Sequence, residues 1–188
     1  MILPCPRLRR ALVALALLSS WGAAPALAHT RDAATAFAPA VPLALALPRA
    51  ALTPGAIDPA VTQADLDRTI CVPGYSRAVR PPERYTERLK RRQMRQYGWA
   101  DRRLRDYEED HLISLELGGS PTDRRNLWPQ PHHVVGGWGS YAKDKLENRL
   151  HALVCRGALP LRTAQQAIAT DWIGAYRRWV GGQPDTRR

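Results

Sequence analysis

The sequence has only three cysteines, Cys5, Cys71 and Cys155, and no two of them form a CxxC pair. Cysteine-built zinc sites usually carry such closely spaced pairs, so we do not expect a tight zinc site of that kind. If Cys5 is removed with a signal peptide, an even count remains, which is typical of a disulfide in an exported protein. We therefore expect a Cys71–Cys155 disulfide, and the long loop that it closes corresponds to a stabilisation of ~4.5 kcal/mol. A metal pair and two buried thiols are the alternatives.

A hydrophobic run long enough for a membrane span is also lacking, because a span needs about 20 apolar residues. The run ALVALALLSSWGAAPA is shorter and follows the basic stretch MILPCPRLRR, and the small-x-small tripeptide ALA precedes His29. This order predicts a cleaved signal peptide at residues 1–28 and a secreted or periplasmic protein with no membrane association after cleavage. A retained membrane anchor is the alternative.

Acidic residues are scarce, with 17 against 28 lysines and arginines. Removal of residues 1–28 takes away three arginines and no acid, which leaves a formal charge of +8. Such an excess favours a polyanionic partner, namely nucleic acid, an acidic membrane or an acidic wall polymer. No obligate protein partner is evident from the sequence.

Residues 29–60 are rich in alanine, leucine and proline, and the prolines at 39, 42, 48, 54 and 59 interrupt any long helix. We expect a disordered linker here; the alternative, a second apolar anchor at 41–52, is disfavoured by Pro42, Pro48 and Arg49. The folded domain is expected over 61–182 and a frayed tail over 183–188.

Three helices are expected in the domain, and with the short strands described below they predict an α+β fold. The first begins after Pro82 and ends at Gly98, the second covers 141–155, and the third covers 163–180. Residues 69–82 read as a strand or extended segment bent at Pro73-Gly74. The second helix has the clearest periodicity, and its apolar positions are Ala142, Leu146, Leu150, Leu153 and Val154.

The segment 88–105 carries eight basic residues and one acid, Asp101. We expect it to follow the phosphates of DNA, or of RNA, with little sequence specificity; a solvated helix face is the alternative. The basic residues are Arg88, Lys90, Arg91, Arg92, Arg95, Arg102, Arg103 and Arg105.

The stretch YEEDHLISLELGGSPTDRRNLWPQP, residues 107–131, places Asp110 beside His111, a Gly-Gly loop after them, and Asn126 fifteen positions beyond the histidine. A neutral imidazole can take a proton from water, and a carboxylate is a hard oxygen ligand for Mg²⁺. With the helix that follows, the order strand, loop, strand and helix is a ββα unit. A surface ion pair at Asp110-His111 is the plain alternative.

These residues resemble the HNH endonucleases, or ββα-metal nucleases. The resemblance covers roughly residues 64–180, is strongest over 108–157, and rests on EDHLISLELGG, RNLWPQP, KDKLENRLHALVCRG and AQQAIATDW. It implies that His111 is the general base, that Asp110 is a metal ligand and that Asn126 orders the loop around the base. It also implies cleavage to a 5′-phosphate and a 3′-hydroxyl.

The third HNH position falls on Val135, Gly136 and Gly137, none of which matches the His or Asn of the family. Glu147 and His133 are equal candidates for the missing metal ligand, followed by Asp144 and His132. The plain alternatives are an exposed loop for the two histidines and an i−4 pair with Lys143 for Glu147, which is worth a few tenths of a kcal/mol.

The sequence thus predicts an endonuclease that uses Mg²⁺, or Mn²⁺ or a similar ion, to hydrolyse phosphodiester bonds. One alternative is a non-enzymatic exported module that binds polyanions through a degenerate HNH core. Another is a hydrolase of a different exported polyanion, such as teichoic acid or a phospholipid head group.

Overall fold

The computed structural model of the protein describes residues 42–185. Within that part the fold is α+β, as predicted from the sequence. The predicted signal peptide lies outside the described residues, as do 29–41 of the predicted linker and 186–188 of the tail. The helices and strands are α1 (Tyr75–Val79), α2 (Glu83–Tyr97), β1 (Tyr107–His111), β2 (Leu127–Pro131), α3 (Ser140–Cys155) and α4 (Leu161–Trp179). The short 3₁₀ helices are η1 (Leu43–Ala46), η2 (Gln63–Arg68), η3 (Leu104–Asp106), η4 (Leu115–Leu117), η5 (Arg124–Asn126) and η6 (Val135–Gly137).

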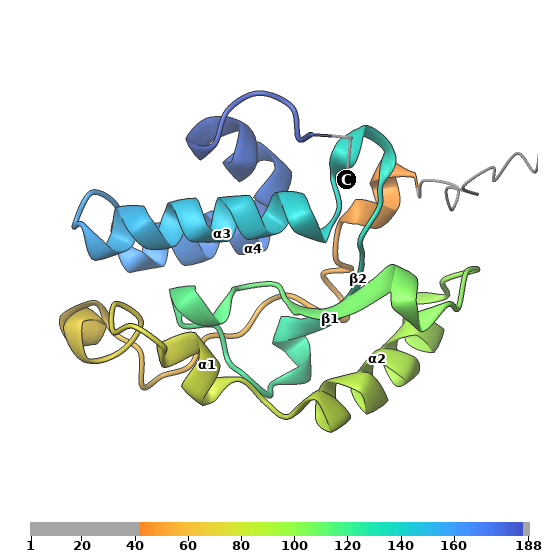
Figure 1. Cartoon of the computed structure of the whole chain (residues 1–188), viewed down its shortest axis with the longest axis horizontal. Coiled ribbons are helices and arrows are strands. Elements are labelled where there is room, and N and C mark those ends of the chain that lie inside the picture. Colours follow the sequence, from red (N-terminus) through yellow and green to blue (C-terminus); the bar gives the residue numbers. More distant parts are fainter. Residues whose placement is uncertain (1–41, 186–188) are drawn as a thin grey trace, which may run out of the picture. The chain divides into compact units, whose positions relative to one another are not determined.

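Strands β1 and β2 form an antiparallel hairpin in which Asp110 pairs with Trp128 and His111 with Leu127. Figure 1 shows this hairpin between α2 on one side and the α3–α4 pair on the other. Each side has its own core. Met94, Tyr97 and Trp128 pack between α2 and the hairpin, whereas α3 and α4 pack against each other through a larger cluster. The hairpin belongs to the smaller core, because the larger cluster contains no residue of β1 or β2.

Helix α2 confirms the sequence prediction at both ends. It begins directly after Pro81-Pro82, and it ends at Gly98, whose φ of +65° is left-handed. Glycine adopts this conformation without steric cost, and the Gly98 amide donates to the Arg95 carbonyl oxygen at 3.1 Å. The helix thus ends in a regular C-terminal cap.

Helix α3 also follows its prediction, with Leu146, Leu150 and Val154 buried along one face. Helix α4 covers the predicted third helix but is interrupted at Asp171, whose φ and ψ are −155° and 80°. The Asp171 carboxylate accepts a hydrogen bond from the Gly174 amide at 2.9 Å, so it caps the second half of the helix.

The extended segment predicted at 69–82 is wrong. The Pro73-Gly74 turn is present, but Gly74 has a φ of +88° and leads directly into the short helix α1. The residues after the turn form hydrogen bonds within this helix, such as Ala78 amide to Gly74 carbonyl at 3.0 Å, rather than with a strand.

The predicted disordered linker is corrected for residues 42–60, which are ordered and contact both cores. Ala46 is fully buried, and its carbonyl oxygen accepts the indole N–H of Trp172 at 3.1 Å. The Thr53 hydroxyl lies 2.7 Å from the Tyr97 hydroxyl and donates to the Leu127 carbonyl at 3.2 Å. The prolines do prevent a long helix, but the short apolar pieces between them can still bury against the domain. The frayed tail is corrected in the same way at Pro184, which is buried.

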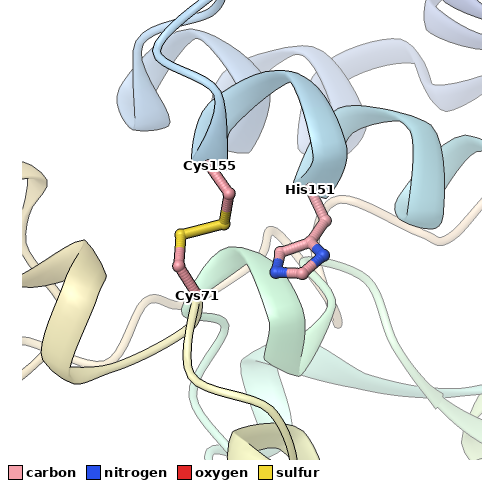
Figure 2. Close-up of side chains that lie close together, drawn as sticks. All are labelled: Cys71, His151 and Cys155. Carbon is pink, nitrogen blue, oxygen red and sulfur yellow. A yellow bond between two sulfur atoms is a disulfide. The ribbon is translucent and has the colours of Figure 1, made fainter.

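The predicted disulfide is present between Cys71 and Cys155, whose Cα atoms are 5.6 Å apart. It joins the loop before α1 to the end of α3 across a separation of 84 residues (Figure 2). No helix in the described part of the chain has the length and hydrophobicity needed to cross a membrane.

Candidate active site

Asn126 holds the loop between the two strands. It is fully buried, and its Oδ1 accepts the Ile113 amide at 2.9 Å. Its Nδ2 donates to the carbonyl oxygens of Ile113 and Ser120, both at 3.0 Å. A single side chain therefore joins both ends of the Gly-Gly loop, which is the loop-ordering position that the sequence suggested for it. Asn126 does not itself line the cavity described below.

The two glycines of this loop are required by close packing and by backbone conformation. A Cβ atom on Gly119 would collide with the Ile113 carbonyl oxygen and would lie 2.7 Å from Asn126 Nδ2. Gly118 has a left-handed φ of +72°. The Gly-Gly pair thus allows the backbone to approach the Asn126 side chain.

His111 stands at the end of β1 with only 3 % of its surface exposed. Its Nε2 lies 3.0 Å from the Pro121 carbonyl oxygen. A carbonyl oxygen can only accept a hydrogen bond, so in the neutral ring the proton is on Nε2 and Nδ1 carries a free lone pair. Burial lowers the pKa of His111 and favours this neutral form.

Asp110 and His111 line the same cavity, which has a volume of about 380 Å³. Strand alternation alone would direct them to opposite faces, but the strand ends at His111, which lets both contribute to one site. Six carboxylates line this cavity, together with the basic side chains of Arg80 and Lys90. The carboxylates are those of Glu87, Glu108, Glu109, Asp110, Asp144 and Glu147.

Burial and mutual repulsion raise the pKa values of several carboxylates in the cavity. Burial, reinforced by Asp110 and Asp144, raises the pKa of Glu108 to about 8. Burial and Asp110 likewise raise the pKa of Glu109 to about 9. Within the described part of the chain, both carboxylate oxygens of Glu109 are buried without a hydrogen-bond partner. The cavity therefore favours protons or cations.

Lys143 places one cation at the edge of this cavity. Its side chain is fully buried, and Nζ donates to Asp110 Oδ2 and to the His111 carbonyl oxygen, both at 2.7 Å. It also pairs with Glu147. Burial alone would lower the pKa of Lys143, but the two carboxylates outweigh burial and raise it above its ordinary value. The ammonium group thus bridges the two carboxylates that the sequence suggested as metal ligands.

The cavity offers carboxylate oxygens and no sulfur, which is the ligand type that a hard divalent cation prefers. Among the described residues, no three of these carboxylates have oxygens within 4.8 Å of one another, so binding an ion would require side-chain rotation. Asp110 can contribute its second oxygen, and Glu108 and Asp144 line the same cavity. Glu147 is committed to Lys143, as in the alternative considered from the sequence, although the pair is buried rather than on the surface.

The two neighbouring histidines are not part of this cavity. His133 is exposed and its ring lies 6.0 Å from that of Tyr141. His132 stacks on Tyr141 and its Nδ1 lies 2.9 Å from the Ser140 hydroxyl. The expectation that His133 holds the metal is therefore corrected, because His133 is exposed and does not line the cavity. His132 does not line it either, although its Nδ1 lies 3.9 Å from Glu108 Oε2.

Seven of the eight residues of the predicted basic surface are exposed to solvent, and Lys90 is the exception. Lys90 is buried, donates to the Tyr107 carbonyl at 3.0 Å and pairs with Glu87 at 2.6 Å, so it cannot contact phosphate as predicted. Arg103 pairs with Asp101 and Asp106. The exposed members are Arg88, Arg91, Arg92 and Arg95 on α2 and Arg102, Arg103 and Arg105 after it.

The sequence interpretation gave no role to Arg80, Glu87, Glu108 or Glu109, which line the cavity, and it considered Lys143 only as an ion-pair partner of Glu147. Glu108 could have been found, because it lies two positions before Asp110 in the same strand and so shares its face. Lys143 could have been found less easily, since its i+4 spacing to Glu147 gives no indication of burial. Arg80 carried no local signal.

Comparison of the chain with protein-family models, with curated proteins and with solved structures gives no match. The function is therefore argued from the site alone.

Proposed function

We propose that the protein is an endonuclease that hydrolyses the phosphodiester bonds of DNA, or of RNA, with the help of a divalent cation. The observation that supports this most is the state of His111. Its hydrogen bond to Pro121 leaves a basic Nδ1 on a neutral ring, beside a cavity lined by carboxylates. A general base next to a cation site is the combination that metal-assisted hydrolysis requires.

In this proposal His111 Nδ1 takes the proton from the attacking water, and the Pro121 carbonyl holds the ring in position. Asp110, Glu108 and Asp144 would hold the cation, for which Mg²⁺ is the first candidate and Mn²⁺ the second. When bound, the cation stabilises charge on the phosphate and on the leaving oxygen. Arg80 lines the cavity and is placed to bind a phosphate oxygen.

The partner is a nucleic-acid strand bound mainly through its phosphates. The exposed arginines of α2 supply a sequence-independent attraction that salt weakens. They also compensate for the acidic cavity, which would otherwise repel a polyanion. The disulfide fits an oxidising compartment, so we place the protein in the secreted or periplasmic space.

A plasmid-nicking assay tests this function. Purified protein should nick supercoiled DNA with Mg²⁺ or Mn²⁺ and not with EDTA, and His111→Ala should lower the rate by at least about 100-fold, as expected for loss of a general base. His133→Ala is the matched control, because that histidine is exposed and outside the cavity. Equal rates for His111→Ala and the unchanged protein would contradict the proposal, provided that both have the same melting temperature.

The second candidate is a binding module without activity, and one specific observation favours it. Lys143 already neutralises Asp110 and Glu147 in the way that a metal ion would. A protein of this kind would shift DNA in a gel, with a strong dependence on salt, but would not nick it with any divalent cation. The two assays on one preparation separate the candidates.

A further inference from the structure

A second group of metal-ligating side chains lies at the other end of α3, around the disulfide. His151 and Cys155 are four residues apart on this helix and so share a face. Cys71 reaches the same place from the loop before α1 (Figure 2). One ligand atom from each of the three residues lies within 4.8 Å of the other two.

The imidazole of His151 lies between the sulfur atoms and a carboxylate. Figure 2 shows the ring nitrogen farther from the main chain, Nε2, on the side of the sulfur atoms. The other nitrogen, Nδ1, lies 3.8 Å from a carboxylate oxygen of Glu116. A histidine that binds a metal through one nitrogen commonly donates the other N–H to a carboxylate. The Glu116 carboxylate lies just beyond hydrogen-bond distance, so a small movement would let it accept this N–H.

We propose that reduction of the Cys71–Cys155 disulfide turns this group into a Zn²⁺ site. The ligands are the thiolates of Cys71 and Cys155 and the Nε2 atom of His151, with a fourth position open to water. Tetrahedral Zn²⁺ with Zn–S bonds of about 2.3 Å places two sulfurs about 3.8 Å apart. The Cα separation of 5.6 Å is short enough for the two side chains to reach that distance by rotation. The site shares no residue with the acidic cavity, so it stands independently of the proposed nuclease activity.

The chemistry requires a reductant and the movement of one proton on the ring. A phosphine supplies two electrons to the S–S bond, takes an oxygen atom from water, and leaves two thiols and a phosphine oxide. Zn²⁺ then displaces the two thiol protons. Nε2 now donates to the Ile70 carbonyl at 2.8 Å, so this hydrogen bond is exchanged for the Zn–N bond. The ring proton moves to Nδ1, where Glu116 can accept it.

The test is a titration of the reduced full chain with Co²⁺, which replaces Zn²⁺ and reports thiolate ligands by a charge-transfer absorption. The band should appear at one Co²⁺ per chain in phosphine and be absent from the oxidised protein. Added Zn²⁺ should remove it. We expect Glu116→Gln to weaken the binding about 10–100-fold, as for other carboxylates that orient a metal-bound histidine. His151→Ala should weaken it at least as much, and His133→Ala should leave it unchanged.

Two results would overturn the proposal. One is a reduced chain without the thiolate band, whether or not circular dichroism shows it to be folded. The other is a His151→Ala chain that binds Co²⁺ as tightly as the unchanged protein, because the cysteines would then bind the metal without the pre-arranged histidine. Binding to the acidic cavity cannot be mistaken for this site, since carboxylates give no thiolate band.

Discussion

At the scale of single residues, Lys143 supplies the positive charge that neutralises Asp110 and Glu147 beside the acidic cavity. It is fully buried, and its three hydrogen bonds all go to groups at or beside the proposed site. Replacement by methionine keeps the volume but leaves Asp110 and Glu147 without their cation. Breaking a buried ion pair in this way costs about 3–5 kcal/mol, so we expect Lys143→Met to lower the free energy of unfolding by that amount in urea denaturation.

The same substitution should increase the stabilisation of the protein by divalent cations, because Asp110 and Glu147 no longer pair with the Lys143 ammonium group. We expect Mg²⁺ to raise the melting temperature of Lys143→Met more than that of the unchanged protein. Lys145→Met is the control, since Lys145 is exposed and should change stability by less than about 0.5 kcal/mol. A Lys143→Met protein that is destabilised but insensitive to Mg²⁺ would show that these carboxylates do not bind the cation.

Single residues also differ in how far the sequence alone can point to them. His111, Asn126 and the Gly-Gly pair could be singled out because local spacing carries their signal. Lys143 and Arg80 could not, since their importance comes from burial and from contacts across the fold. His133 is a candidate only because it lies near the third HNH position, and the structure directs it to solvent beside Tyr141.

At the scale of elements, α3 was predictable from its regular apolar stripe, and α2 from the two prolines before it and the glycine at its end. The order in segment 42–60 was not predictable. Its prolines exclude a long helix, but the composition does not show which parts of the domain its short apolar pieces pack against. The strand expected at 69–82 failed for a related reason: a Pro-Gly turn is compatible with a helix after it as well as with a strand.

Residues 42–60 should therefore be required for folding. We expect a chain that begins at Val61 to melt well below one that begins at Pro42, because it lacks the Thr53 hydrogen bonds and the apolar contacts of Ala46 and Leu52. Thermal melting by circular dichroism measures the difference. Equal melting temperatures for the two chains would mean that the segment only lies on a domain that is already stable.

The arginines on the outer face of α2 should determine how the binding of nucleic acid depends on salt concentration. Removal of two phosphate contacts by Arg91→Gln/Arg95→Gln should reduce the slope of log K against log salt by about 1.8 on duplex DNA. Arg156→Gln/Arg162→Gln is the matched control, because it removes the same charge from exposed positions away from α2. Fluorescence anisotropy at several salt concentrations gives both slopes, and equal slopes would place the nucleic acid elsewhere.

At the scale of the whole molecule, a basic protein encloses an acidic cavity, and this makes its stability depend on pH. The folded state raises the pKa of Glu109 from 4.5 to about 9, so between these values it binds a proton that the unfolded state has released. The free energy of unfolding therefore decreases as the pH rises through this window, by at most about 1.4 kcal/mol per pH unit for one such group. We expect Glu109→Gln to make the urea midpoint less dependent on pH between 5 and 9.

Protons and a divalent cation should compete for these carboxylates. We expect Mg²⁺ to raise the melting temperature more at pH 8 than at pH 5, because the raised pKa values of Glu108 and Glu109 keep these two acids neutral at the lower pH. Glu108→Gln removes an oxygen ligand and should reduce the Mg²⁺ effect at pH 8. Glu83→Gln should not, since Glu83 is an exposed acid outside the cavity. A Mg²⁺ effect that is the same at both pH values, or the same in all three proteins, would mean that the ion binds away from the cavity and that the proposed hydrolysis lacks its cation.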